Sequence, residues 1–367
     1  MWYEYIIDRG LIPEPMLRLI VRSYLWKYSN RVNRLSEFQL HEIQKDFLKD
    51  LGIGPIAEEM EMANQQHYEI SPKFYERFLG SQMKYSGSIW TAETKCLSSA
   101  DLGTLDLYLD RADLKDGHRV LELGSGWGSL CLHIAKRLPN ALITSVTNSE
   151  SQKSFIDDKI RNIGLDNLVV VHSDVNVYQD SDRYDRILSI EMFEHLRNPT
   201  ALMKQIVEWM KSDGRLFLQV FSHRVMPQYF DDTENSWMAK NFFTRGVMPY
   251  SGMYDALSKE LTVIKKWHVS GLHYHRSLEA WLQRLKIVGP TFSDSDCAGD
   301  PSQKIYSTTN SGFSLFFVLN FSNLIEGLIG MLTIILWVLV EVWILEGGSR
   351  WSWRFWNSCC KLSAGCR

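Results

Sequence analysis

Short apolar runs alternate with helical stretches from Gly117 to Ser270, and this alternation constrains the fold more than any other feature. Helices are predicted between the runs, for example at Trp127–Arg137, Ser149–Ile163 and Pro199–Lys211. The runs themselves are predicted as strands at His118–Leu123, Ala141–Thr147, Leu168–Ser173, Tyr184–Ile190, Gly214–Phe221 and Leu261–Ser270. This order is typical of an α/β fold with a mostly parallel, doubly wound, Rossmann-like sheet and helices on both faces. Ligands of such sheets bind at the carboxyl ends of the strands.

Composition and charge narrow the class of protein. Of the 367 residues, 45% are hydrophobic and 23% are charged, which suffices for a packed core. The formal net charge of −3 argues against a general nucleic-acid binder. The six cysteines form no C-x-x-C pair and no His/Cys cluster has zinc spacing, so we expect free thiols and no metal. Glu4 and Asp8 interrupt the first residues, which therefore do not resemble a signal peptide, and a cytoplasmic enzyme is the first expectation.

Residues 1–66 are predicted to form an N-terminal helical region. Pro13 and Pro15 mark a helix start. Apolar side chains then recur at helical spacing, at Met16, Leu19, Ile20, Leu25 and Trp26, with basic residues between them. We expect the apolar side to pack on the chain's own domain while the basic side is solvated. The alternative is a basic amphipathic helix lying on an anionic membrane.

A glycine-rich turn follows the first predicted strand. Glu122 and Leu123 lead into Gly124-Ser125-Gly126-Trp127-Gly128, which then enters a helix. Glycines allow a tight turn and a close approach of a ligand to backbone N–H groups. The spacing is G-x-G-x-G, not the G-x-G-x-x-G of dinucleotide enzymes. The second strand ends in Thr147-Asn148-Ser149, without the acid that a nicotinamide cofactor's ribose would need, and Asp174 offers a carboxylate to an adenine amino group. S-adenosylmethionine therefore fits better than NAD.

From His67 to Leu285 the chain resembles the cyclopropane-fatty-acid-synthase-like methyltransferases, and most closely their coclaurine N-methyltransferase branch. The opening segment Asp8–Pro13 also looks like that family's first helices. The segments that carry the resemblance are His67–Ile70, Lys84–Ser86, Glu122–Gly128, Asn148 and Ser149 with Gln152, Glu191–His195, Phe242–Pro249, and His273 with Tyr274. The resemblance implies a class I methyltransferase domain over residues 67–286.

The resemblance also implies roles for particular residues. Tyr85 and Ser86 would meet the methionine end of S-adenosylmethionine, and the glycine turn would back the cofactor. The active site that presents an amine to the sulfonium methyl group would contain Glu191, Glu194 and His195. The remaining cofactor contacts would be Gly124, Gly126 and Gly128 in the turn, Thr147, Asn148 and Gln152 near the ribose, and Asp174 near the adenine. From its position before the first glycine, Glu122 can take a hydrogen bond from the cofactor or hold the loop.

Transfer of a methyl group to nitrogen sets chemical requirements on these residues. An amine is mostly protonated at neutral pH, so its proton must leave before it attacks. Carboxylates at Glu191 and Glu194 could hold the ammonium group, and His195 could accept the proton. The alternative is that Glu191 caps the next helix and His195 is a packed or surface histidine. Aromatic residues could line the substrate pocket or belong to the core, namely Tyr68, Phe74, Tyr85, Phe242, Phe243 and Tyr274.

Lipid cyclopropanation is the competing activity on the same fold. It methylates an alkene and, in the family, relies on a bicarbonate that the enzyme holds. Two positions depart from that pattern, since Ser125 stands for the family's glycine-loop cysteine and Gln219 for its strand histidine. These departures favour amine methylation over modification of unsaturated phospholipid acyl chains. Small-molecule amines are therefore the expected partners, and a homodimer is a further expectation.

Beyond Lys286 the chain stops resembling the family, whose last strand completes the sheet. Residues 287–312 are predicted as a linker and 313–346 as an apolar helix or membrane segment, with Gly327–Val340 free of charge. Residues 347–367 form a basic, cysteine-containing tail that would suit a membrane anchor. A buried helix or a non-native tail is the alternative, and Phe313–Asn320 could supply the missing strand. A catalytically impaired, membrane-tethered cofactor-binding protein is thus a third hypothesis.

Overall fold

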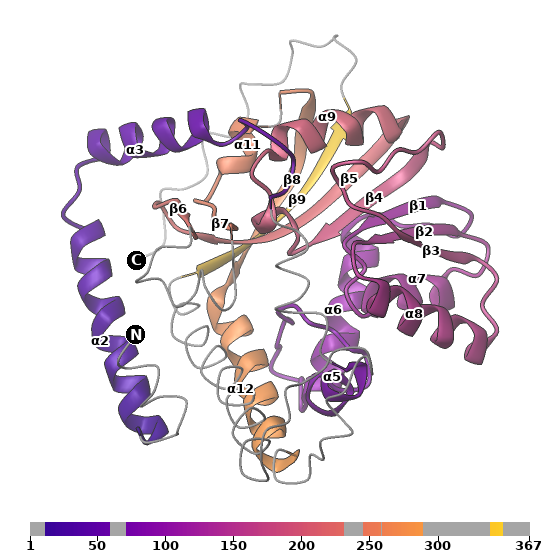
Figure 1. Cartoon of the computed structure of the whole chain (residues 1–367), viewed down its shortest axis with the longest axis horizontal. Coiled ribbons are helices and arrows are strands. Elements are labelled where there is room, and N and C mark those ends of the chain that lie inside the picture. The colour runs from indigo at the N-terminus through magenta and orange to yellow at the C-terminus, as the bar shows by residue number, and fades with distance from the viewer. Residues whose placement is uncertain (1–11, 59–70, 231–244, 258, 289–337, 348–367) are drawn as a thin grey trace, which may run out of the picture.

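A central seven-stranded sheet organises the computed structural model, which describes residues 12–58, 71–230, 245–257, 259–288 and 338–347 (Figure 1). The strand order is β3-β2-β1-β4-β5-β9-β8. Strands β1 to β5 pair in parallel, whereas β9 is antiparallel to both of its neighbours. The strands are β1 (Arg119–Leu123), β2 (Leu142–Thr147), β3 (Leu168–His172), β4 (Tyr184–Ile190), β5 (Met210–His223), β8 (Leu261–Ser270) and β9 (Val338–Gly347), beside a small hairpin of β6 (Gln228–Tyr229) and β7 (Val247–Met248).

Helices cover both faces of the sheet. One core contains side chains of α5, α6, α7, α8 and α12, and the other contains side chains of α3, α9 and α11. Adjacent residues of one strand enter opposite cores, as Val120 and Leu121 of β1 do, because side chains alternate along a strand. The helices are α2 (Glu14–Val32), α3 (Glu37–Asp50), α5 (Pro72–Leu79), α6 (Leu97–Arg111), α7 (Ser129–Arg137), α8 (Glu150–Ile163), α9 (Pro199–Trp209), α11 (Met253–Leu257) and α12 (Gly271–Val288), with a 3-10 turn, η1, at Phe193–His195.

The predicted α/β class and the parallel sheet are confirmed. All six predicted strands are present, most within a residue or two of their predicted ends. The exception is β5, which begins at Met210 and not at Gly214, because its first part pairs with Tyr184 across a register shift. The helices between the strands also lie where the apolar periodicity placed them. This order of strands, with one antiparallel strand near the edge, places the carboxyl ends of β1, β2 and β4 side by side.

The strand that completes the sheet comes from a segment for which the sequence predicted a helix or a membrane span. All but the last residue of strand β9 falls in the stretch 313–346 that was predicted as an apolar helix or membrane segment, so for residues 338–346 that prediction is wrong. Its backbone pairs with β5 from Arg215↔Glu346 to His223↔Val338, and Leu345 is fully buried. A short apolar run is compatible with a buried strand as well as with a helix. Here the strand form is favoured because β5 and β8 would otherwise each have an unpaired edge. The proposed strand Phe313–Asn320 lies outside the described residues.

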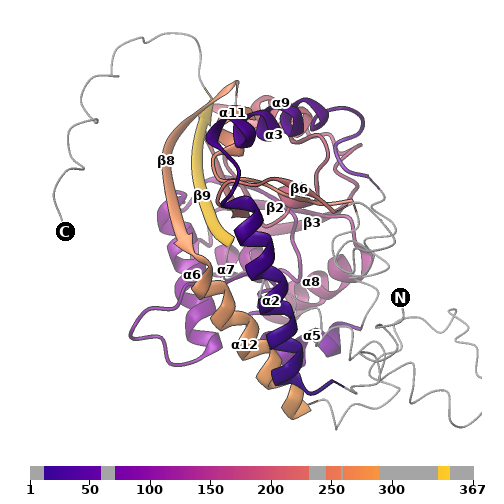
Figure 2. The same cartoon turned by 90° about the vertical axis from the view of Figure 1, so that its left-hand side faces the viewer.

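The N-terminal helix α2 lies beside α12 and contacts it through charged side chains (Figure 2). It begins at Glu14 behind Pro13, as predicted, and Arg18 donates to both carboxylate oxygens of Glu279 on α12. The expected packing of its apolar side is wrong, since Leu25 is buried but four apolar residues are largely exposed, namely Met16, Leu19, Ile20 and Trp26. In the described part of the chain, the helices are too short or too polar to span a bilayer.

Candidate active site

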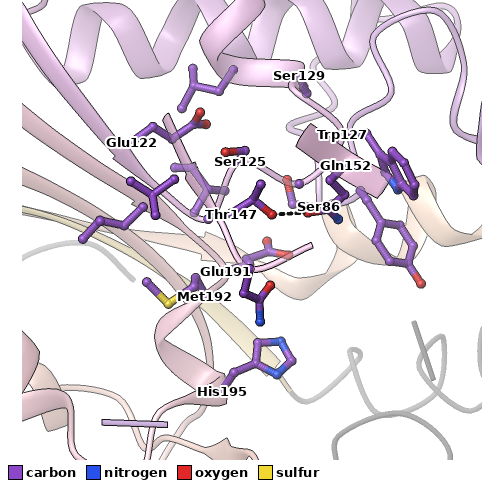
Figure 3. Close-up of a pocket in the computed structure, with 18 of the residues that line it drawn as sticks. Ser86, Glu122, Ser125, Trp127, Ser129, Thr147, Gln152, Glu191, Met192 and His195 are labelled. Carbon is purple, nitrogen blue, oxygen red and sulfur yellow. Dashed lines mark hydrogen bonds between the residues drawn. The ribbon is translucent and has the colours of Figure 1, made fainter. Parts of the chain in front are cut away.

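A cavity opens at the carboxyl ends of β1, β2 and β4, where the two halves of the predicted site meet (Figure 3). The glycine turn and the end of β2 form one wall, and the segment from Glu191 to His195 forms the opposite wall. The cavity is lined by ten of the residues singled out from the sequence, namely Tyr85, Ser86, Glu122, Gly124, Gly126, Thr147, Asn148, Gln152, Glu191 and His195.

The glycine turn has a backbone conformation in which other residues would be strained. Gly124, Gly126 and Gly128 all have positive φ, at 90°, 50° and 81°. A Cβ at Gly128 would also lie 2.8 Å from Ile156 of α8, so this glycine lets α8 pack against the turn. Gly128 itself does not line the cavity, and it forms the start of α7 instead. The turn thus needs glycine both for its conformation and for the approach of a neighbouring helix.

Several polar atoms on the glycine-turn side are buried and unpaired within the part of the chain that the structure describes. The Thr147 hydroxyl donates to Oε1 of Gln152 at 2.7 Å, which leaves the Nε2 group of Gln152 for another acceptor. Nε2 of Gln152, Nε1 of Trp127 and Oγ of Ser129 are buried and find no hydrogen-bond partner among the described residues. Because leaving buried polar atoms unpaired costs about 1–3 kcal/mol each, this wall has the character of a binding surface for a polar ligand.

Glu122 lies deep in the same wall and is only 2% exposed. The Ser145 hydroxyl contacts one of its carboxylate oxygens and also lies 2.7 Å from Oγ of Ser125. Burial raises the pKa of Glu122 to about 7, although hydrogen bonds from Ser145 and Cys131 oppose that shift. The side chain therefore exchanges its proton near neutral pH.

Glu191 stands on the opposite wall in a strained conformation. Its φ is 51°, in the left-handed region that residues with a Cβ rarely adopt. Three donors from separate segments hold its carboxylate. They are the Gly87 amide at 3.3 Å, Nε2 of Gln219 on β5 at 3.0 Å, and the Tyr274 hydroxyl of α12 at 3.0 Å. Burial raises the pKa of Glu191, and Lys84 together with the three donors counteracts that rise.

Glu194 and His195 belong to the 3-10 turn η1 that follows, and they differ in exposure. His195 is partly exposed and lines the cavity. Glu194 is fully buried, is absent from the lining, and accepts a 2.6 Å hydrogen bond from the Phe221 amide. Burial and the nearby Glu191 raise the pKa of Glu194 well above its usual range, which favours the neutral form of this carboxyl. It supports the turn from behind.

Other candidate residues are not part of the cavity lining. Asp174 accepts hydrogen bonds from the backbone and side-chain amides of Asn176, and the neighbouring Ser173 lines the cavity instead. Phe74 belongs to the core between α5 and its neighbours. The candidates Tyr68, Phe242 and Phe243 lie outside the described residues.

Two further side chains line the cavity although no role was predicted for them. Lys84 is 2% exposed and Tyr108 is 1% exposed, and the ammonium of Lys84 lies 5.4 Å from the centre of the Tyr108 ring. Lys84 precedes Tyr85 and Ser86, so its position next to predicted contacts was the available signal. Tyr108 lies in the middle of α6, where an aromatic residue at helical spacing indicates core and nothing more.

Comparison with known proteins identifies both N-methyltransferases and cyclopropane synthases as relatives. Residues 57–295 match a family model described as mycolic acid cyclopropane synthetase. (S)-coclaurine N-methyltransferase from Thalictrum flavum subsp. glaucum is 32% identical over 302 residues, which cover 78% of this chain and 81% of the relative. Cyclopropane-fatty-acyl-phospholipid synthase from Escherichia coli (strain K12) is 27% identical over 236 residues, 64% of this chain and 59% of that protein.

Solved structures agree with these relationships. The crystal structure of coclaurine N-methyltransferase bound to N-methylheliamine and SAH (S-adenosylhomocysteine) superposes with a TM-score of 0.83 and 27% identity, covering 94% of this chain and 98% of that one. A cyclopropane synthase from Mycobacterium tuberculosis has a TM-score of 0.62 at 19% identity, which shows a shared fold. The predicted resemblance is therefore confirmed, and the chain belongs to the cyclopropane synthase-like family of class I methyltransferases, which use S-adenosylmethionine as methyl donor.

Proposed function

We propose that the chain transfers the methyl group of S-adenosylmethionine to the nitrogen of a small, aromatic amine. The observation that carries this proposal is the Glu191 carboxylate, which is held by three donors in the cavity that the glycine turn also lines. A fixed carboxylate attracts an ammonium group and stabilises the positive charge that nitrogen acquires as it is methylated. Relatives that are named N-methyltransferases of alkaloids support the same acceptor class.

The wall with unpartnered polar atoms is the proposed cofactor site. Nε2 of Gln152, oriented by Thr147, and Nε1 of Trp127 would donate to the cofactor, and the glycine turn would lie against it. The other contacts would come from Tyr85, Ser86 and Asn148, which line the same cavity. When bound, S-adenosylmethionine supplies an electrophilic methyl group on a positively charged sulfur. The protein's share of the catalysis is then largely the alignment of the two reactants.

The opposite wall is the proposed acceptor site. Glu191 would hold the protonated amine, and His195 would take its proton, because an imidazole exchanges protons near neutral pH. The nitrogen lone pair then forms the new N–C bond while the C–S bond breaks and its electrons remain on sulfur. Glu194, which is buried and accepts from the Phe221 amide, would act by holding η1 in place.

The same geometry disfavours lipid cyclopropanation. That reaction needs a separate small oxyanion as a base, and a site for it requires converging hydrogen-bond donors. In this chain three converging donors already bind the Glu191 carboxylate. Gln219, which stands where a histidine was expected, is one of them. A carboxylate built into the chain serves an amine acceptor, and it would repel a second anion at the same donors.

Radiolabelled methyl transfer tests the proposal. The purified chain is incubated with methyl-labelled S-adenosylmethionine and, separately, with a panel of benzylisoquinoline and other aromatic amines or with vesicles of unsaturated phospholipid. We expect label in the amine fraction and an N-methyl product by mass spectrometry. Label in the lipid fraction alone would contradict the amine assignment. Binding of S-adenosylhomocysteine without transfer to either acceptor would instead support a catalytically impaired protein.

A further inference from the structure

Lys84 carries a buried charge in the wall between the two proposed sites. Its ammonium donates to the Ser86 hydroxyl at 2.8 Å, the Ser86 carbonyl at 3.1 Å and the Gly87 carbonyl at 2.7 Å. An ammonium has three protons, and three oxygen atoms surround it here, two of them carbonyl oxygens that can only accept. These contacts accommodate the charged form with a partner for each proton.

These contacts stabilise a turn at Ser86 and Gly87, and this turn contacts Glu191. The amide of Gly87 donates to Oε1 of Glu191, while the carbonyl of the same residue is held by Lys84. The turn leaves no space for a side chain, because a Cβ at Gly87 would lie 2.4 Å from the Tyr274 ring. Tyr274 in turn donates to the second oxygen of Glu191. Lys84 thus anchors the segment from which one of the three donors of Glu191 comes.

Charge links the two residues as well as geometry. Burial lowers the pKa of Lys84 to about 8, and Glu191 and Asp101 oppose that shift. Reciprocally, Lys84 lowers the pKa of Glu191, which burial raises. Asp101 is fully buried, accepts from the Ser88 hydroxyl at 2.6 Å, and has a pKa raised to about 6 by burial. The other titratable groups that interact with Glu191 are Glu194, Tyr108 and Tyr274.

We propose that Lys84 is a positioning residue for methyl transfer, which holds the Ser86–Gly87 turn against Glu191 and supplies a positive charge that acts on its carboxylate. This inference rests on the proposed function of Glu191 and adds the group that prepares it. Lys84 does not itself touch the reacting atoms. A lysine with a purely structural role would affect stability and leave the ionisation of Glu191 unchanged.

Three variants test the proposal, namely Lys84→Met, Lys84→Arg and, as a control, Lys204→Met at an exposed lysine of α9. With an amine that the wild type methylates, we expect Lys84→Met to lower kcat about 10- to 100-fold, because the turn and the carboxylate lose their anchor. Loss of the positive charge raises the pKa of Glu191, so the acid limb of the kcat–pH profile moves upward by about one pH unit. Lys84→Arg keeps the charge and should keep the acid limb of the wild type. Lys204→Met should match the wild type throughout.

Two outcomes would overturn the proposal. One is an acid limb in Lys84→Met at the wild-type pH, with the variant folded and binding S-adenosylhomocysteine. The other is an upward shift of the same size in Lys84→Arg as in Lys84→Met. If the wild type methylates no amine, the proposed function fails, and Lys84 is judged by calorimetric titration with S-adenosylhomocysteine. Because Ser86 lines the cavity, Lys84→Met should then bind about tenfold more weakly than Lys204→Met, and equal affinities would reject the role of Lys84.

Discussion

Gln152 and Trp127 on one wall of the cavity contrast with Glu191 on the other in how their polar atoms are paired. On the glycine-turn wall, Nε2 of Gln152 and Nε1 of Trp127 are buried and unpaired within the described part of the chain. On the other wall, the Glu191 carboxylate is held by Gly87, Gln219 and Tyr274. Unpaired buried groups are costly unless a ligand pairs with them, whereas a fully paired charge is already organised before any ligand arrives.

From this difference we expect the glycine-turn wall to bind the cofactor through hydrogen bonds, and the Glu191 wall to act on the acceptor through its charge. Changes on the glycine-turn wall should weaken the affinity for the cofactor and leave turnover at saturation almost unchanged. Changes around Glu191 should lower turnover, because the carboxylate acts most strongly as positive charge develops on nitrogen. The variants of Glu191, Gln152 and Tyr274 test this separation, and a variant of Glu122 tests the protonation of a group in the glycine-turn wall.

The largest effect is expected for Glu191→Gln, which removes the charge and keeps the shape of the side chain. We expect kcat to fall about 100- to 1000-fold, with S-adenosylhomocysteine affinity within a few-fold of wild type. Glu194→Gln should lose less than Glu191→Gln, because the raised pKa of Glu194 favours a neutral side chain, which glutamine resembles. Steady-state kinetics on a methylated amine, with Glu208→Gln at an exposed position of α9 as control, measure both. Equal losses in the Glu191 and Glu194 variants would break the distinction between them.

The next effect concerns the pH dependence of the unfolding free energy, to which the protonation of Glu122 contributes. Its pKa in the folded chain is about 7 against a usual value of 4.5, so the folded state binds this proton more tightly than the unfolded state. Stability contributed by this group is therefore lost as pH rises from about 5 to 8. Glu122→Gln cannot ionise, and its unfolding free energy relative to wild type should rise by about 3 kcal/mol across that window. Urea unfolding at both pH values measures this change, and a pH-independent difference would refute it.

A smaller effect is expected for Gln152→Ala on the glycine-turn wall. Loss of one hydrogen bond to the cofactor should weaken S-adenosylhomocysteine binding about 3- to 10-fold, with kcat at saturating S-adenosylmethionine unchanged. Isothermal titration and kinetics, beside Gln228→Ala at an exposed position, provide the comparison. A fall in kcat without a change in affinity would place Gln152 in the function of the opposite wall.

The smallest effect is expected for Tyr274→Phe, which deletes one of the three donors to Glu191 and keeps the ring that packs on Gly87. The pKa of Glu191 should rise, because a hydrogen bond to its ionised form is lost. The carboxylate then forms only at higher pH, so kcat should fall about threefold at pH 7 and recover as pH increases. A kcat–pH profile beside that of Tyr24→Phe, an exposed tyrosine of α2, tests this. A loss independent of pH would argue against it.

Local sequence patterns predicted most of the fold and many of the residues that line the cavity. The glycine turn after β1, Thr147 at the end of β2 and Glu191 at the end of β4 meet because the carboxyl ends of parallel neighbours share one edge. Helix α2 shows the limit of the same reasoning. Its apolar residues have helical spacing, but spacing does not record which face meets the rest of the chain, and four of those side chains are exposed.

From the sequence alone, the alternation of strands and helices and the cofactor class could be determined, because both depend on residues close together in the chain. Only the tertiary structure decided that Val338–Gly347 is a strand, since the same apolar run fits a helix until two unpaired strand edges are present to accept it. Only the tertiary structure showed that Lys84, Gly87, Gln219 and Tyr274 surround Glu191. These residues come from three distant segments, and the hydrogen bonds that join them leave no periodic or local pattern in the sequence.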